Sequence, residues 1–165
     1  MLKIYKILFV LCCLSLTLHA QTESKKASLT IDGAVKTTLH LLAQDLDKMD
    51  TVSVVSTDKA NKAHRYSGVL LSDLLKKAGV TLGEELKGAN LVKYLLVEAS
   101  DNYKVVFALP EADPVFLERK IILANRMDGA LLPEAIGPFQ IIIEGEKKKA
   151  RFVRQAIRIT VKSAQ

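Results

Sequence analysis

The stretch over residues 120–146 constrains the fold more than any other part of this chain. It contains two apolar runs, residues 121–123 and 141–143, which are rich in β-branched side chains and short enough to be buried strands. The second run is entered through Gly137 and Pro138, and because proline fixes φ and has no N–H, the strand is expected to begin after Pro138. A rigid loop beside a buried strand can hold a ligand, or it can simply carry the chain between two sheets. This stretch alone leaves both interpretations open.

The first twenty residues have the composition of an export signal. Lys3 and Lys6 form a positive start, residues 7–18 form an apolar run, and Leu-His-Ala provides a cleavage site before Gln21. The apolar run is short for a membrane span. The sequence therefore predicts a signal peptide over 1–20, a flexible polar stub over 21–27 and one domain over 28–162. The expected location is the bacterial periplasm or the medium, with no membrane-spanning segment after cleavage.

Both cysteines, Cys12 and Cys13, lie inside the predicted signal peptide. A lipid anchor on one of them is an alternative, although both lie within the apolar run. Cleavage would leave a chain without a disulfide, a thiolate nucleophile or a cysteine metal ligand. The net charge of +6, which cleavage would lower by two, indicates a weak preference for anions. Nucleic acid is not expected as a partner, because no basic stripe alternates with aromatic side chains.

The remaining pattern predicts an α+β fold, in which mixed β-sheets are combined with a few short helices. Further strands are expected at residues 28–31, 35–42, 51–57, 91–99, 103–109 and 150–162. In the last of these, Ile157, Ile159 and Val161 are expected to point inward.

One clear helix is expected over residues 66–80, because apolar side chains recur on one face and Gly79 closes its end. Shorter helical turns are expected at residues 41–49 and 111–118. Residues 58–65 are expected to form a loop and residues 125–129 a turn, since Asp-Gly favours turns.

The order of these signals resembles the oxidoreductase molybdopterin-binding domain of the sulfite oxidase type, in a small exported form. The resemblance covers roughly residues 29–161 and depends on several short motifs taken together. These motifs are LAQDL at 42–46, YSGVLL at 66–71, SDNY at 100–103, NRMDG at 125–129, LP at 132–133, GPFQ at 137–140 and IRITV at 157–161.

The resemblance implies a mixed α+β fold and, in catalytic members, a molybdenum ion held by a dithiolene pterin and a protein cysteine. That cysteine follows the β run that corresponds to residues 52–56, where this chain offers Ser53, Ser56 and Thr57. Residues 58–63 replace the family's pterin-wrapping stretch, and Gln140 stands where the family commonly has arginine. The resemblance thus names molybdopterin as the candidate cofactor, while molybdenum ligation by cysteine is excluded for the mature chain.

The predicted cofactor contacts lie in the loops that the resemblance brings together. They are Ser56, Asp101, Tyr103, Asn125, Arg126, Gly137 and Gln140. Asp101 and Asn125 also fit ordinary turn chemistry without any ligand, whereas the planar fork of Arg126 suits an anion. The basic turn over residues 147–149 is interpreted as a solvated hairpin tip or a phosphate contact.

No catalytic residue and no metal site is predicted. His40 and His64 are the histidines of the mature chain, and they do not have metal-ligand spacing.

The leading hypothesis is an exported domain of this fold that is not itself a molybdenum enzyme. It would bind a small ligand or a partner protein in the cell envelope. Two alternatives remain open: a molybdopterin-dependent oxidoreductase that holds its metal in another way, and an accessory subunit of such an enzyme.

Overall fold

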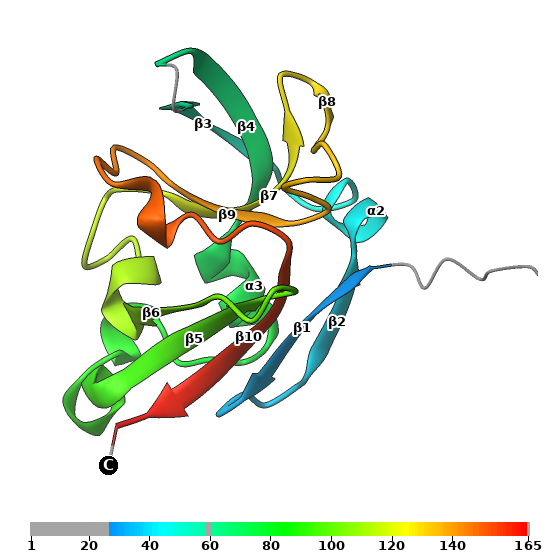
Figure 1. The fold of residues 1–165 in the computed structure, drawn as a ribbon. Coiled ribbons are helices and arrows are strands. Elements are labelled where there is room, and N and C mark those ends of the chain that lie inside the picture. The colour runs from blue at the N-terminus through cyan, green and yellow to red at the C-terminus, as the bar shows by residue number, and fades with distance from the viewer. Residues whose placement is uncertain (1–26, 59–60, 165) are drawn as a thin grey trace, which may run out of the picture.

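The structure is a computed structural model that describes residues 27–58 and 61–164. Its strands form two sheets accompanied by a few short helices, so the predicted α+β class is confirmed (Figure 1). The predicted signal peptide, 1–20, and all but the last residue of the predicted stub, 21–27, lie outside the described residues.

The first sheet has the strand order β2-β1-β10-β5-β6. Its strands are β1 (Ser28–Gly33), β2 (Leu39–Leu42), β5 (Lys93–Ala99), β6 (Lys104–Ala108) and β10 (Ala156–Ser163). β1 and β10 run parallel, and the other neighbours are antiparallel. β6 shows the alternation that forms such a sheet, since Val105 and Phe107 are buried while Lys104 and Val106 are exposed.

The second sheet has the strand order β3-β4-β7-β8, and β9 also pairs with β7. Its strands are β3 (Val52–Thr57), β4 (Ala63–Leu70), β7 (Ile121–Met127), β8 (Ala130–Leu131) and β9 (Gln140–Ile143). β7 and β9 contain the two apolar runs of the 120–146 stretch, and they pair antiparallel with Ile121 opposite Ile143. β9 begins after Pro138, as predicted, and the Gly137–Pro138 peptide bond is cis.

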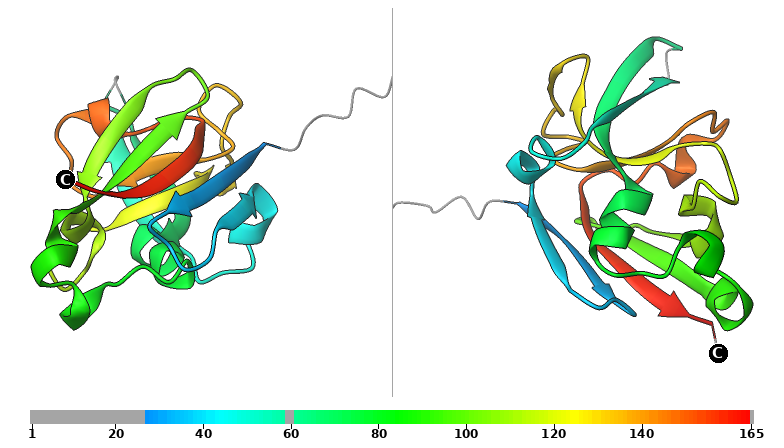
Figure 2. Two further views of the ribbon diagram at one scale, coloured as in Figure 1. Left: turned by 90° about the horizontal axis from the view of Figure 1, so that it is seen from below. Right: turned by 180° about the vertical axis from the view of Figure 1, so that it is seen from behind.

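The helices are short. They are α2 (Ala43–Leu46), α3 (Leu71–Lys77) and the 3-10 turns η2 (Gly83–Glu85), η3 (Gly88–Val92), η4 (Leu109–Ala112) and η5 (Lys149–Arg151). α3 follows β4 directly, buries Leu71, Leu74 and Leu75, and is followed by Gly79 at φ +76°, as predicted. Figure 2 shows α3 on the side opposite to the view of Figure 1. Among the described residues, none of the helices has the length and apolar character needed to cross a membrane.

One hydrophobic core joins the two sheets and α3. Phe107 of the first sheet, Ile122 of the second sheet and Leu74 of α3 all belong to it and are 0–1% exposed. Each such side chain stabilises the fold by about 1.5–3 kcal/mol relative to an exposed one. The core therefore fixes the sheets relative to each other and sets the positions of the loops between them.

The structure of the described part of residues 58–70 differs from the sequence predictions in two places. The predicted loop 58–65 already contains the start of β4, because Ala63 and His64 pair with Thr57 and Ser56 of β3. The predicted helix 66–80 is a strand up to Leu70, because β4 is hydrogen-bonded to β3 on one side and β7 on the other. Ladder partners on both sides outweigh the helical spacing of the leucines.

Several element boundaries also differ. β7 continues through Met127, so the predicted turn 125–129 is confined to Asp128 and Gly129. The second strand covers only the last part of 35–42, and the predicted helix 111–118 is replaced by η4, which starts before Pro110 and ends at Ala112. Ile157 was expected inward but is 43% exposed, because a bulge between Ala156 and Arg158 reverses its direction.

Candidate functional site

The half-buried ammonium group of Lys149 lies against Ser56. Ser56 lies on β3 and is 7% exposed, and its Oγ accepts a hydrogen bond of 2.5 Å from Lys149 Nζ. Nζ also donates to the carbonyl oxygen of Glu146 at 3.3 Å and lies 4.8 Å from the centroid of the Phe152 ring. These acceptors are all neutral, so they solvate the ammonium without cancelling its charge.

Lys149 lines a pocket of about 320 Å³ between the β5–β6 turn and the segment that leads into β10. The lining residues are Ala99, Asp101, Tyr103, Lys149, Ala150, Phe152 and Arg154. The Tyr103 hydroxyl donates to the Ala150 carbonyl oxygen at 2.6 Å, and this bond ties the two walls together. Asp101 Oδ1 accepts from the backbone N–H of Tyr103 at 3.0 Å, which is the turn chemistry expected of an aspartate there.

The second cation of the pocket is Arg154. Four other arginines form ion pairs with carboxylates, but within the described part of the chain Arg154 has no such partner. Burial raises the pKa of Tyr66, and the charge of Arg154 opposes this rise, so the guanidinium lies within electrostatic reach of the phenol. With Lys149 and Arg154 against the one carboxylate of Asp101, the lining favours an anion.

Asn125 and Arg126 form a separate cluster with Asp47, beside α2. Asn125 is 2% exposed, and its Nδ2 donates to Asp47 Oδ1 at 2.9 Å. The Arg126 fork bonds both oxygens of Asp47, Nε to Oδ1 at 3.1 Å and Nη2 to Oδ2 at 3.0 Å. These hydrogen bonds, from Arg126 first and Asn125 second, hold the pKa of Asp47 below its ordinary value. Arg126 lines a second cleft of about 420 Å³, but its fork is already occupied by a carboxylate.

Gly137 and Gln140 line neither of these two pockets, although Pro138, next to Gly137, lines the second. Gln140 is 3% exposed, and its buried Oε1 has no hydrogen-bond partner among the residues that the structure describes. The path from Gln140 to β3 crosses two other strands. Gln140 of β9 pairs with Ala124 of β7, and Ala124 pairs with Gly68 of β4. Gly68 in turn pairs with Val52 of β3, the strand that carries Ser56. Three strand spacings therefore separate Gln140 from β3, and the predicted residues do not form one site.

Of the predicted contacts, Asp101 and Tyr103 thus line one pocket, and Ser56 bonds the Lys149 ammonium of that pocket. Arg126 lines another pocket, with Asn125 beside it. Sequence reasoning did not select Arg154 or Phe152, and it interpreted the turn that contains Lys149 as a solvated hairpin tip or a phosphate contact. The available signal was the run of basic residues before the last strand, in which Phe152 is the single aromatic side chain.

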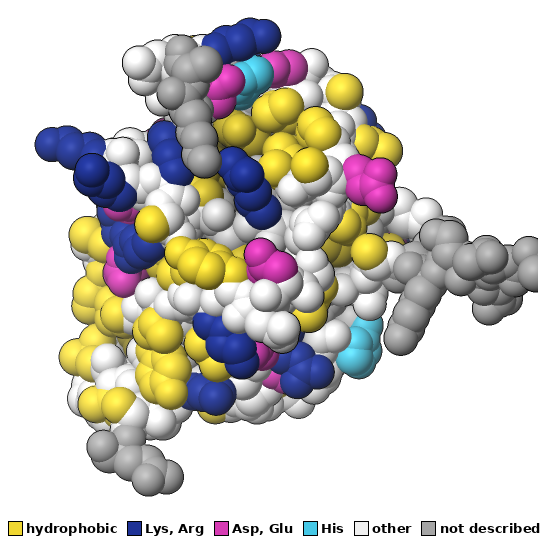
Figure 3. Space-filling view, viewed as in Figure 1, with side chains coloured by type: hydrophobic (Ala, Val, Ile, Leu, Met, Phe, Trp, Pro, Cys, Tyr) yellow, Lys and Arg dark blue, Asp and Glu magenta, His cyan; other side chains and the backbone are white. Residues whose placement is uncertain are grey.

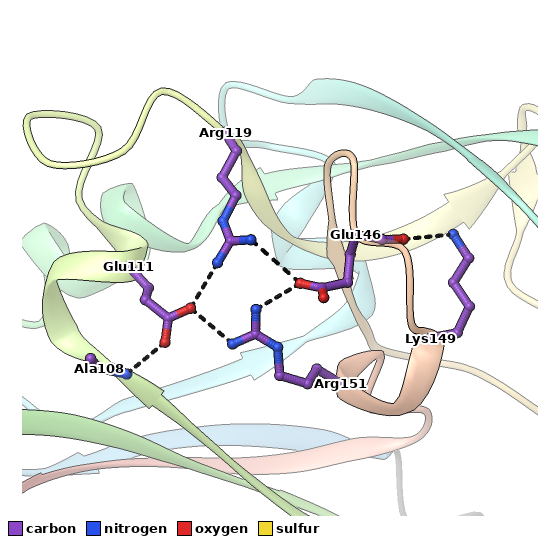
Figure 4. Close-up of polar contacts among 6 residues, drawn as sticks. All are labelled: Ala108, Glu111, Arg119, Glu146, Lys149 and Arg151. Atoms are coloured by element: carbon purple, nitrogen blue, oxygen red, sulfur yellow. Dashed lines mark hydrogen bonds and ion pairs between the residues drawn. The ribbon is translucent and has the colours of Figure 1, made fainter.

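A closed ring of ion pairs lies beside Lys149 (Figure 4). Glu111 Oε2 accepts from Arg119 Nη2 at 2.7 Å and from Arg151 Nη1 at 2.8 Å. Glu146 Oε2 accepts from Arg151 Nη2 at 2.6 Å and from Arg119 Nη1 at 3.4 Å. Burial pushes the pKa of Glu111 up, but the bonds from Arg151 and the Ala108 N–H and the charges of both arginines leave it below its ordinary value.

His64 belongs to a third polar cluster, at the outer end of the β3–β4 hairpin. Its Nδ1 lies 2.6 Å from Asp128 Oδ2, and its Nε2 lies 3.4 Å from Asp58 Oδ2. The bond to Asp128 raises the pKa of His64 above its ordinary value, against the effect of burial. In the two described ranges no group of three or more His, Cys, Asp or Glu side chains could hold a metal ion.

Comparison with known proteins gives two findings. A family model, the oxidoreductase molybdopterin binding domain, matches residues 16–163. The crystal structure of the sulfane dehydrogenase SoxCD from Paracoccus pantotrophus is similar in fold, with a TM-score of 0.59 and 22% identity over 83% of this chain. The match covers 39% of that chain, so the present chain corresponds to well under half of it. No curated protein sequence matches.

Proposed function

This chain belongs to the oxidoreductase molybdopterin binding domain family, and from that premise we propose that it binds a small anion in the pocket beside Lys149. The ligand class is phosphate or the phosphate-bearing end of a larger molecule such as a pterin. The observation that carries the proposal is the half-buried ammonium of Lys149, whose acceptors are the Ser56 hydroxyl and a backbone carbonyl oxygen.

Among the described residues, Lys149 has hydrogen-bond acceptors for two of its three N–H groups, which leaves one for a ligand. An ammonium group has three N–H donors, and Ser56 and Glu146 accept two of them. Arg154, at the same pocket, adds a planar fork that suits an oxyanion. Lys149 is partly buried, so its charge is screened less by water than that of the exposed Arg154.

The side chains around Ser56 do not fit a molybdenum ion. The described residues contain no cysteine, since both lie in the predicted signal peptide. The Ser56 hydroxyl lies in the region where the family resemblance places the ligating thiolate, and here it accepts a hydrogen bond from an ammonium group at 2.5 Å. A cation at that position repels a metal ion, so the donor set supports a domain that keeps the fold but not thiolate ligation.

The test is a titration of the processed chain with inorganic phosphate at low salt, in which NMR or calorimetry measures the binding. Lys149→Met is expected to weaken phosphate binding by roughly tenfold or more, since it removes a charge-assisted hydrogen bond. Lys148→Met is the matched control, because Lys148 is exposed in the same turn and is expected to change the affinity less than about twofold. Equal affinities for the two variants would contradict the proposal.

A second candidate function is binding of a partner protein, as an accessory subunit in the envelope. Exposed apolar side chains on β6 and on the segment after η4 favour it: Val106 is 53% exposed, Val115 58% and Phe116 43%. Figure 3 shows hydrophobic side chains along this flank of the molecule. Copurification of a companion with the native protein, lost in a Val106→Lys variant, would support this function. A monomer without a companion would count against it.

We also propose export to the periplasm or the medium, on the composition of residues 1–20. The expected N-terminus of the protein recovered from the periplasm is Gln21. An intact N-terminus in a cytoplasmic fraction would contradict export.

A further inference from the structure

We propose that Glu146 is a positioning residue for Lys149. It would hold the turn before η5 so that Lys149 Nζ meets Ser56. This inference rests on the proposed function, in which Lys149 supplies the ligand's cation, but its own geometry is independent of any ligand.

The side chain of Glu146 is fixed from two directions. Its Oε2 accepts from Arg151 Nη2 at 2.6 Å and from Arg119 Nη1 at 3.4 Å, and the side chain is 17% exposed. Both arginines also bond Glu111 Oε2, so the carboxylate of Glu146 is one corner of the closed ring in Figure 4. A carboxylate held by two guanidinium groups has little freedom to rotate.

The main chain of the same residue contacts Lys149. The Glu146 carbonyl oxygen accepts a hydrogen bond from Lys149 Nζ at 3.3 Å, and Figure 4 shows this contact beside the ring. The two halves of Glu146 therefore face different groups, the ring and the ammonium. A rotation of its backbone would move the acceptor away from Lys149.

The backbone of the turn supplies only a long hydrogen bond at this residue, from the Glu146 N–H to the Ile143 carbonyl oxygen at 3.4 Å. Gly145 has φ +67°, and Lys147 and Lys148 are exposed. Figure 3 shows Lys and Arg side chains projecting from this part of the surface. A lysine side chain on such a turn samples many rotamers unless something fixes its base. The ring supplies the anchor, because Glu111 Oε1 also accepts from the Ala108 N–H at the end of β6.

The arrangement forms a continuous connection between the two sheets. It runs from β6 and η4 through the ring to Glu146, and from Lys149 to Ser56 on β3. The position of the ammonium thus depends on residues that do not line the pocket.

The experiment measures the reactivity of Lys149 directly, with limiting acetic anhydride and mass spectrometry of the processed chain. Reactivity is expressed relative to Lys148, which is exposed in the same turn. In Glu146→Gln, Lys149 is expected to react roughly three- to tenfold faster, because local opening sets the rate of a protected group. Glu144→Gln is the matched control: Glu144 pairs with Lys120 outside the ring, so the Lys149 ratio is expected to stay within about twofold of the unmodified chain.

An unchanged Lys149 ratio in folded Glu146→Gln would overturn the inference. If this variant does not fold, Glu146→Asp takes its place; it keeps the charge and shortens the reach, and the same rise in Lys149 reactivity is expected. Phosphate titration of the same proteins separates the two proposals. Faster acetylation in the variant, without phosphate binding by the parent chain, would refute the proposed function and leave the positioning role standing.

Discussion

At the scale of single residues, two glycines lie where a methyl group would meet different neighbours. A Cβ on Gly68 would lie 2.0 Å from the Leu123 carbonyl oxygen and 2.5 Å from the Ala124 Cα, both in the backbone of β7. A Cβ on Gly137 would lie 2.9 Å from the Leu132 Cβ, 3.1 Å from the Leu132 carbonyl oxygen and 3.2 Å from the Pro133 carbonyl oxygen. The overlap at Gly68 is therefore the deeper of the two, and the paired strand that it meets cannot move aside without disturbing the sheet.

We therefore expect Gly68→Ala to lower the free energy of unfolding more than Gly137→Ala, which should cost about 1–3 kcal/mol. Urea denaturation of both variants gives the comparison. Because Gly137 lines neither pocket, folded Gly137→Ala is also expected to bind phosphate with unchanged affinity. Selective loss of phosphate binding would instead return Gly137 to the site, as the sequence predicted.

His64 gives the folding stability a dependence on pH. The bond to Asp128 raises the pKa of His64, and the bond to His64 lowers the pKa of Asp128. A raised histidine pKa stabilises the folded chain fully below the unfolded value of about 6.5, and the contribution is lost as the pH rises through the folded pKa. The lowered pKa of Asp128 also stabilises the folded chain, and this contribution to the unfolding free energy is lost as the pH falls through the pKa of Asp128 in the folded state.

The expected result is a difference in unfolding free energy between the parent chain and His64→Gln that shrinks as the pH rises from neutral into the alkaline range. Histidine NMR titration gives the pKa itself, which should lie above the ordinary value. A midpoint at or below that value would show that the Asp128 contact does not persist in solution.

At the scale of elements, the bulge in β10 decides which isoleucines are part of the core. Ile157 is 43% exposed, whereas Ile159 is 0% exposed. Ile157→Thr is expected to change the unfolding free energy by less than about 0.5 kcal/mol. Ile159→Thr should cost about 1–3 kcal/mol, because it buries a hydroxyl and removes apolar volume. Chemical denaturation distinguishes them, and equal costs would contradict the bulge.

Strict alternation could not have revealed this bulge, because the run Ile157, Ile159, Val161 fits an ordinary strand. The same limit applies to residues 66–70. Leu70 and the leucines of α3 have helical spacing, yet β4 extends to Leu70 because β3 and β7 flank it. Local patterns predicted the end of α3 and the strands β5, β6 and β9 well, since each is bounded by its own turn or proline signal. They failed where the deciding partner is distant in sequence.

At the scale of the whole molecule, the sequence again predicted the local features of the candidate site but not its contacts between distant residues. The sequence could propose Ser56, Asp101 and Tyr103, because a family resemblance orders them along the chain. It could not pair Ser56 with Lys149, which lies 93 residues later and reaches it only through packing of the two sheets. The ion-pair ring was equally hidden, since it joins residues 111–119 to residues 146–151 through the pairs Arg119–Glu146 and Arg151–Glu111.

Molybdenum, the metal that the family name suggests, does not suit the side chains around Ser56. We expect the processed chain, produced in a host that makes the molybdenum cofactor, to contain far less than one molybdenum atom per chain. The physical reason is electrostatic: Lys149 and Arg154 bring two cations to the pocket near Ser56, and the described residues supply no thiolate to offset a metal ion. Elemental analysis measures the content, with a cysteine-containing family member from the same host as the control for cofactor supply. If this chain and the control both contained one molybdenum atom per chain, the metal would be held without a cysteine at the position of Ser56. The pocket beside Lys149 would then bind a molybdenum cofactor and not a simple anion.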